Sequence, residues 1–181
     1  MFFTKEALSK ISTIGSIQPG SKYLIAKCLK DVEFKNDQII LEFGSGNGNF
    51  TAEILKRIPT STKLISFETN KKFFEYCLKK FKSHENFEIH NCSAENFIQV
   101  SEVKENNIDY VISSLPLSLL KKELIESIVQ KVMDHLKPNG CFIQYQYSFD
   151  KYLFLRNKFN TVKLNFVVRN VPPSFVYKCY K

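Results

Sequence analysis

Apolar runs alternate with stretches of helical periodicity along most of this chain. Short apolar runs predict strands over residues 38–43, 63–68, 87–91, 108–113 and 140–147. Stretches with a helical period predict helices over residues 49–58, 70–82, 94–100 and 119–136. The turn signal Pro138-Asn139-Gly140 is expected to end the last of these helices. Because strands alternate with helices, the sequence predicts an α/β fold with a mostly parallel, doubly wound sheet.

The C-terminal pattern differs from this alternation. Residues 151–160 predict one more short helix. Two β-rich segments follow it, residues 161–170 and 174–180, on either side of Val171-Pro172-Pro173. We therefore predict an antiparallel terminal hairpin.

Residues 1–35 precede the alternation and predict an N-terminal helical extension. The first apolar stripe consists of Phe2, Phe3, Ala7, Leu8, Ile11 and Ile14. A second helical stretch covers residues 21–30, with Ser21 as its N-cap. The first stripe could dock on the core or lie on a membrane surface, since apolar residues flanked by lysines suit that interface. Without repeats or linkers, residues 1–181 are expected to form a single domain.

Composition is ordinary for a soluble globular protein, with 44% hydrophobic and 24% charged residues. No apolar run approaches the roughly 18 residues that cross a bilayer, and no signal-peptide pattern opens the chain. The five cysteines lack C-x-x-C spacing, and the three histidines lack ligand spacing. We therefore expect a cytoplasmic protein with buried thiols and without metal, and no feature indicates an obligate protein partner.

Positive charge is concentrated in one part of the chain. The net charge is +8. Residues 56–82 contain eight basic side chains against Glu68 and Glu75. Such a surface favours polyanions, either nucleic acid or anionic lipid headgroups, although lysines that merely solvate two helices give the same pattern.

The segment 40–50 carries the strongest signal for a ligand. An apolar run that contains Glu42 leads into Gly44, Gly46 and Gly48, and a helical pattern follows. A strand, a glycine turn and a helix in this order form a cradle for a nucleotide-like ligand, because glycine permits a tight turn and close approach. A tight turn without a ligand is the alternative. A dinucleotide fingerprint needs glycine at the sixth position from Gly44, where this chain has Asn49.

The pattern E-x-G-x-G-x-G, from Glu42 to Gly48, resembles motif I of the class I S-adenosylmethionine-dependent methyltransferases. This resemblance implies S-adenosylmethionine as cofactor. It also implies a Rossmann-like sheet in which an antiparallel hairpin closes the otherwise parallel part.

Further residues extend the predicted cofactor site. Glu68, 20 residues after Gly48, ends the second predicted strand, where a carboxylate can accept hydrogen bonds from both ribose hydroxyls of an adenosine. Glu42 is expected to orient the glycine loop or to meet the positive end of the cofactor through water. Residues 92–97 resemble the family segment G-D-A-x-x-L that grips adenine, with Ser93 where Asp is usual. The predicted cofactor-binding residues are Glu42, Gly44, Ser45, Gly46, Gly48, Glu68, Thr69, Ser93 and Ala94.

The end of the fourth predicted strand is expected to bind the methyl acceptor. Its sequence, Ser113-Ser114-Leu115-Pro116-Leu117, corresponds to motif IV of the methyltransferases. Adenine-N6 methyltransferases carry Asn or Asp there, then Pro-Pro or Leu-Pro, then an aromatic ring that stacks on an extruded base. This chain has Ser114 for the amide and Leu117 for the ring, which favours an aliphatic substrate over a flipped base. Ser113, Ser114, Leu115 and Pro116 are the candidate catalytic residues.

A resemblance over nearly the whole chain is more specific. Its segments are residues 14–19, 113–117, 142–145 and 169–177. They look like bacterial phospholipid N-methyltransferases, a family similar to the ribosomal RNA adenine dimethylases. That family methylates phosphatidylethanolamine at an anionic membrane surface, which implies a phospholipid substrate and a peripheral position on the inner face of the membrane.

The amine that attacks the methyl group must first lose a proton. The loop 113–117 offers no His or Asp, so the proton could pass to water or to Tyr145 or Tyr147, both of which could equally be core residues. Three other functions stay open on the sequence: an RNA (adenine) methyltransferase, a small-amine methyltransferase, and a regulatory domain that has lost activity.

Overall fold

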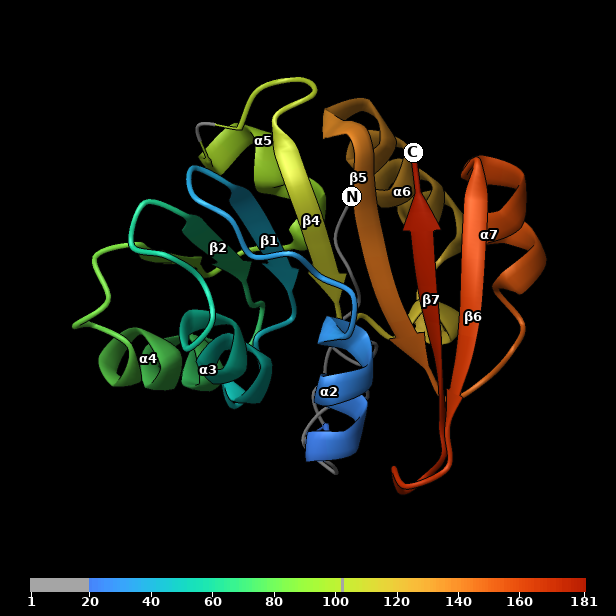
Figure 1. Ribbon diagram of the computed structural model, residues 1–181, viewed down its shortest axis with the longest axis horizontal. Helices are drawn as coiled ribbons and strands as arrows, with labels where there is room; N and C mark the ends of the chain where they lie inside the picture. Colours follow the sequence, from blue (N-terminus) through green and yellow to red (C-terminus); the bar gives the residue numbers. More distant parts are fainter. Residues whose placement is uncertain (1–19, 102) are drawn as a thin grey trace.

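The computed structural model describes residues 20–101 and 103–181, which form one seven-stranded sheet covered by helices (Figure 1). The strands follow the order β3-β2-β1-β4-β5-β7-β6. Their bounds are Ile39–Phe43 for β1, Lys63–Phe67 for β2, Phe87–His90 for β3, Ile108–Ser113 for β4, Leu136–Gln146 for β5, Thr161–Val167 for β6 and Ser174–Tyr180 for β7. Strands β1 to β5 pair in parallel, and β7 runs antiparallel to both neighbours. The predicted Rossmann-like sheet with an antiparallel C-terminal hairpin is thus confirmed.

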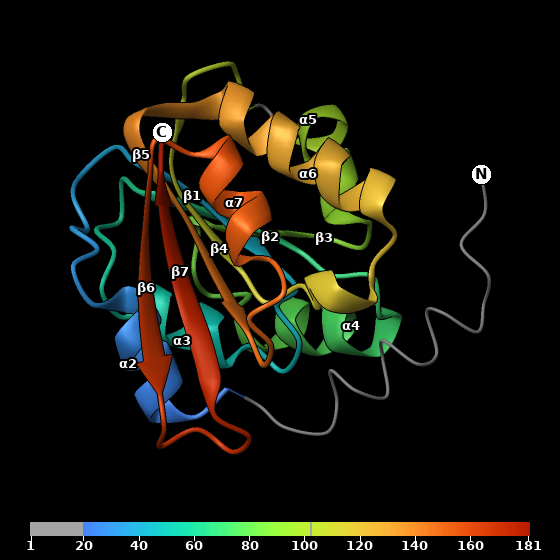
Figure 2. The ribbon, with the colours of Figure 1, turned by 90° about the vertical axis from the view of Figure 1, so that its right-hand side faces the viewer.

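Helices cover both faces of the sheet, because the parallel strands have apolar side chains on both sides. One core packs every strand except β3 against α5 (Phe97–Val100), α6 (Lys122–His135) and α7 (Tyr152–Lys158). The other core packs against α2 (Lys22–Leu29), α3 (Asn49–Leu55) and α4 (Lys71–Lys80). Figure 2 shows α6 and α7 on the opposite side of the sheet from α2 and α3.

Alternation along single strands explains the two cores. In β1, Ile40 belongs to the core beneath α2 to α4, whereas Leu41 and Phe43 belong to the core beneath α5 to α7. All three side chains are fully buried. Four of the five cysteines are buried as predicted, and Cys92 is half-buried.

The start of β5 differs from the prediction. The sequence predicted a helix to residue 136 and a strand from 140, but α6 ends at His135 and β5 begins at Leu136. Ile108 pairs with Leu136 and Tyr110 with Cys141, so residues 137–140 bulge out of the strand. The turn signal therefore marks a bulge inside the strand rather than a turn before it.

The helix predicted over residues 119–136 is also shorter. It is preceded by a 3₁₀ turn, η2, over Leu117–Leu119, and α6 starts at Lys122. The short helix predicted over 94–100 is present as the 3₁₀ turn η1 (Ala94–Asn96) followed by α5.

The N-terminal predictions are only partly covered by the structure. The helix predicted over 21–30 is present as α2, and the Ser21 hydroxyl accepts a hydrogen bond from the Leu24 N–H at 3.2 Å, as an N-cap does. The predicted stripe from Phe2 to Ile14 lies outside the described residues. Among the helices of the described part of the chain, none has the length and apolar character that crossing a bilayer requires.

Candidate functional site

The glycine turn connects β1 to α3 at the carboxyl edge of the sheet. Gly44, Gly46 and Gly48 have φ angles of +82°, +51° and +76°. Residues with a side chain rarely adopt these angles, so glycine is needed at each position. The Gly44 N–H donates to the Phe67 carbonyl at 2.8 Å, which fixes the start of the turn to the end of β2.

The three glycines face different surroundings. A Cβ atom on Gly48 would lie 2.6 Å from the Phe81 ring and 3.1 Å from Cys77 Sγ, so this position faces the core. A Cβ atom on Gly46 would have no neighbour within 4 Å among the described residues. The main chain at Gly46 is therefore open to a ligand, while Gly48 lets α3 pack closely.

Glu42 is buried beside the turn. It accepts hydrogen bonds from Thr51 Oγ1 of α3 at 2.7 Å and from Ser66 Oγ of β2 at 2.5 Å. Burial raises the pKa of this carboxyl from 4.5 to about 7, although the two hydroxyl groups oppose the shift. Glu42 thus ties β1 to α3 and β2, and it reaches the glycine loop through these elements rather than by a direct hydrogen bond.

Glu68 follows β2 and contacts the turn directly. Its Oε2 accepts from the Gly46 N–H at 2.8 Å, and its Oε1 accepts from the Asn70 N–H at 2.7 Å. Burial raises the pKa of the carboxyl, and the backbone N–H groups oppose that shift. Because each carboxylate oxygen has a second lone pair, Glu68 can still accept hydrogen bonds from a ligand's hydroxyl groups.

The segment after β3 lies next to Glu68. The Glu68 carbonyl accepts from Asn91 Nδ2 at 2.8 Å. Ser93 Oγ caps η1 by accepting from the Glu95 N–H at 3.3 Å, Ala94 is buried, and Thr69 is exposed. The ends of three neighbouring parallel strands thus carry all the residues that the sequence predicted for the cofactor.

The loop after β4 is bound to the glycine turn. The Ser114 N–H donates to the Phe43 carbonyl at 2.9 Å, and Ser114 Oγ donates to the Gly44 carbonyl at 2.6 Å. Ser113 is buried, and its Oγ accepts from the Leu115 N–H at 3.3 Å. The Ser114 hydroxyl proton is therefore engaged by the main chain, and only its lone pairs are left for a substrate N–H.

Two glutamines of β5 hold this loop, and the sequence analysis assigned them no role. The Leu115 carbonyl accepts from Gln144 Nε2 at 3.0 Å and from Gln146 Nε2 at 2.7 Å. Both glutamines are buried. Two amides at alternate positions of an otherwise apolar strand were the signal that could have identified them.

Leu117 does not take the place of a substrate-facing ring. In the sequence, this residue occupies the position of the stacking aromatic residue of adenine methyltransferases. Its side chain is fully buried in the core beneath α5 to α7, so it cannot contact a substrate. The half-buried residues Leu115 and Pro116 and the exposed Leu119 form the accessible apolar part of the loop.

Polar groups also connect this loop to the segment after β5. Ser118 Oγ lies 2.8 Å from Ser148 Oγ and donates to Asp150 Oδ1 at 2.8 Å.

Burial raises the pKa of Tyr145 and Tyr147, so both phenols stay protonated near neutral pH. Neither tyrosine is therefore suited to take a proton from an amine.

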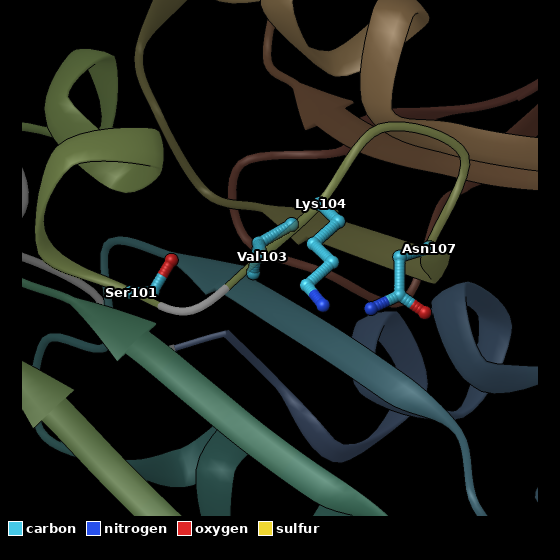
Figure 3. Close-up of a pocket in the computed structure, with 4 residues that line it drawn as sticks. All are labelled: Ser101, Val103, Lys104 and Asn107. Carbon is cyan, nitrogen blue, oxygen red and sulfur yellow. The ribbon is translucent and has the colours of Figure 1, made fainter.

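A separate hollow lies at the opposite edge of the sheet. It is lined by Ser101, Val103, Lys104 and Asn107, which precede β4 (Figure 3). Because β4 runs from there toward the glycine turn, this hollow is remote from the residues described above.

Within residues 20–101 and 103–181, no group of three or more His, Cys, Asp and Glu side chains is placed to hold a metal ion.

The edge formed by β1, β2 and β3 fits S-adenosylmethionine. Two buried polar atoms there, Glu42 Oε1 and Ser45 Oγ, have no hydrogen-bond partner among the described residues. Open space adjoins Gly46, and the Glu68 carboxylate lies beside it. This edge therefore offers acceptors for hydroxyl groups, open main chain and polar atoms that lack partners. Such groups match an adenosine that carries a charged amino-acid tail.

Comparisons with known proteins agree with this geometry. A family model described as a methyltransferase domain matches residues 40–140, more than half of the chain. An ornithine lipid N-methyltransferase from Singulisphaera acidiphila is 26% identical over 170 residues, which cover 93% of this chain and 88% of that protein. The ribosomal RNA small subunit methyltransferase A from Caldanaerobacter subterraneus is 28% identical over 66% of this chain and 48% of that protein.

Solved structures show the same fold. The precorrin-6y C5,15-methyltransferase from Geobacter metallireducens superposes with a TM-score of 0.73 at 15% sequence identity. The superposition covers 89% of this chain and 90% of that one.

Proposed function

The chain belongs to the methyltransferase domain family, and on that premise we propose that it methylates the amine of a phosphatidylethanolamine-type membrane lipid. It is an S-adenosylmethionine-dependent methyltransferase. Its cofactor supplies a sulfonium methyl group, which a neutral amine can attack in line. The proposal concerns the acceptor and the residues that position it.

The observation that carries the lipid proposal is similarity over almost the whole length to a lipid N-methyltransferase. The acceptor loop supports it, because residues 113–117 provide hydroxyls, carbonyls and aliphatic side chains but no aromatic ring or amide for a base. Similarity to the ribosomal RNA enzyme covers about half of that protein. This partial similarity supports RNA as the methyl acceptor less strongly than the full-length similarity supports a lipid.

The chain's own residues would position the reactants. Glu68 and the open main chain at Gly46 would bind the adenosine, and the two β5 glutamines would fix the Leu115 carbonyl beside the amine. Burial of this edge would exclude water from the reacting groups. With both nearby tyrosines protonated, the amine would release its proton to bulk water before it enters this edge.

The proposed lipid acceptor also implies where in the cell the enzyme acts. We expect a cytoplasmic enzyme that binds the inner face of the membrane peripherally. We also keep the prediction that residues 1–181 form a single domain with residues 1–35 as an extension.

Partition of a labelled methyl group would test the acceptor. The protein would be incubated with methyl-labelled S-adenosylmethionine and one of four acceptors: phosphatidylethanolamine vesicles, ornithine lipid vesicles, ribosomal RNA or phosphoethanolamine. We expect label in the lipid phase with phosphatidylethanolamine. A Gly46→Val variant serves as the control in which we expect cofactor binding, and with it all labelling, to be lost.

Labelling of the other three acceptors would contradict the proposal in different ways. Label in ribosomal RNA alone would establish the RNA alternative. Label only in the water phase would establish a small soluble amine. Label in ornithine lipid but not in phosphatidylethanolamine would keep the lipid class and correct its headgroup.

A further inference from the structure

The connection between β6 and β7 exposes aliphatic and aromatic side chains. Val168 and Val171 are 68% and 72% exposed, and Phe166 is 52% exposed. Phe149, which follows β5, is also exposed, and Phe175 lies between the two phenylalanines at ring distances of 4.9 Å from Phe166 and 5.6 Å from Phe149. We name these residues the hairpin-tip surface. The three phenylalanine rings pack against one another, and the two valines are exposed on the adjoining connection between β6 and β7.

The backbone beneath this surface is held from within. Asn170 is buried, and its Nδ2 donates to the Pro172 carbonyl at 2.8 Å and to Ser174 Oγ at 2.9 Å. Its Oδ1 accepts from the Ser21 N–H at 3.2 Å, which joins the hairpin to the start of α2. The polar groups of the turn therefore point inward while the valines point outward.

Positive charge lies beside the hairpin tip on its α2 side. The Arg169 guanidinium lies 5.4 Å from the centre of the Tyr23 ring, and Lys22 Nζ lies 5.3 Å from the same ring. Residues 161–181 contain no Asp or Glu. An apolar tip with flanking cations and a tyrosine matches the interface of an anionic bilayer, where valine enters the acyl region and the cations meet phosphates.

The hairpin tip lies at the functional edge of the sheet. Figures 1 and 2 both show the β6–β7 connection beside α2, at the end of the molecule toward which the parallel strands run. The glycine turn and the loop 113–117 lie at this same end. A membrane bound there would face the acceptor loop.

We propose that the hairpin-tip surface docks this enzyme on anionic membrane, so that the loop 113–117 meets lipid headgroups. This docking role deepens the proposed lipid methylation and rests on it. A bilayer fits better than RNA, because the two most exposed side chains of the surface, Val168 and Val171, offer nothing to a base or a phosphate, and the phenylalanines pack on one another. The hairpin-tip surface also differs from the basic segment 56–82, in which the exposed large apolar side chains are Tyr76 and Leu78, both on α4.

A matched pair of valine substitutions tests the proposal. Val168→Asp changes the tip, and Val100→Asp changes a 41% exposed valine at the end of α5, at the opposite edge of the sheet. Co-sedimentation of the full chain would use vesicles of equal phosphatidylglycerol and phosphatidylcholine. We expect the partition coefficient to fall about tenfold for V168D and less than about twofold for V100D. Equal loss in both variants, or none in V168D, overturns the proposal.

Tryptophan fluorescence gives a second readout that does not depend on weakened binding. The chain contains no Trp, so a single introduced Trp reports its own position. On the same vesicles, V168W emission should shift to the blue and be quenched by brominated acyl chains, whereas V100W emission should not. Vesicle-bound V168W with unchanged emission would mean that another part of the chain, such as residues 1–19, makes the contact. A response to RNA but not to vesicles would also overturn the proposal.

Failure of docking and failure of the proposed function are distinguishable. Lipid methylation with an unresponsive tip would reject the docking surface alone. Vesicle binding through the tip, with label only in RNA or water, would reject the lipid acceptor while the docking surface stands.

Discussion

The two halves of the functional edge are built from different chemistry. The half formed by β1, β2 and β3 contains two buried carboxylates, Glu42 and Glu68, which are bound by hydroxyl and backbone N–H groups. The half formed by β4 and β5 contains hydroxyls, carbonyls and two amides, and the loop 113–117 has no ionisable side chain.

On the proposed assignment of the site, this difference separates recognition of the donor from recognition of the acceptor. A carboxylate binds hydroxyl groups in fixed geometry, so we expect the first half to select the ribose hydroxyls of the cofactor. Neutral groups position an amine without holding it as a cation. The second half thus suits an acceptor that must be uncharged when it reacts.

The largest expected effect comes from a side chain at Gly46. Gly46→Val would fill the open space beside the turn and force valine to a φ of +51°. We expect affinity for S-adenosylhomocysteine to fall at least about a hundredfold, roughly 3 kcal/mol, measured by calorimetry. Gly48→Ala is the contrast, since its methyl group would strike Phe81 and lower the melting temperature. Unchanged affinity in G46V would show that the donor does not bind at this turn.

The next effect concerns the pH dependence of stability through Glu42. Its pKa is raised from 4.5 to about 7, so between these values the folded state binds the proton and the unfolded state does not. The free energy of unfolding should therefore fall as pH rises through this window, by up to about 3 kcal/mol. Glu42→Gln should remove this contribution, so its stability relative to the wild type should increase with pH. Chemical denaturation of both proteins between pH 5 and 8 checks this; a difference that does not change with pH would contradict it.

A smaller effect is expected in the acceptor half. Gln146→Ala removes one of the two amide donors to the Leu115 carbonyl and loosens the loop. We expect kcat to fall about tenfold, while affinity for S-adenosylhomocysteine changes less than about twofold. Gln130→Ala, on the exposed side of α6, is the matched control. Loss of cofactor affinity in Q146A would mean that the acceptor half also contributes to cofactor binding.

The smallest effect would sharpen the donor half. Ser93→Asp introduces the acid that the related segment usually carries, and Asp caps η1 as well as Ser does. If this segment binds adenine, cofactor affinity should rise about threefold, or roughly 0.7 kcal/mol, in the same calorimetric assay. Weaker binding would place adenine elsewhere.

The donor half was easier to predict from sequence because its residues lie at short, fixed spacings. Gly44, Gly46 and Gly48 form one turn, and Glu68 directly follows the next strand, so the glycine motif and the order of the strands placed them on one edge. The acceptor half joins residues about 30 positions apart. The alternating amides of β5 could have indicated that Gln144 and Gln146 have polar partners, but neither the choice of the Leu115 carbonyl as partner nor the burial of Leu117 follows from a local pattern.

The same limit explains the error at β5. Pro138, Asn139 and Gly140 form a strong local turn signal, and Asn139 does adopt a φ of +66°. However, Leu136 pairs with Ile108, and Lys137 Nζ lies 2.9 Å from Asp109 Oδ2. The strand therefore already pairs with β4 at Leu136, before the bulge. This pairing is between residues distant in the sequence, so a local turn signal could not reveal it.

The bond between Ser114 and Gly44 has a consequence for how such an enzyme can evolve. A side chain on Gly44 would strike the Ser114 hydroxyl, and that hydroxyl donates to the Gly44 carbonyl. A longer Asn or Asp at position 114 would meet the same Gly44 backbone that the serine hydroxyl now contacts. We therefore expect that changes of residue 114 during evolution were selected together with the conformation of the glycine turn.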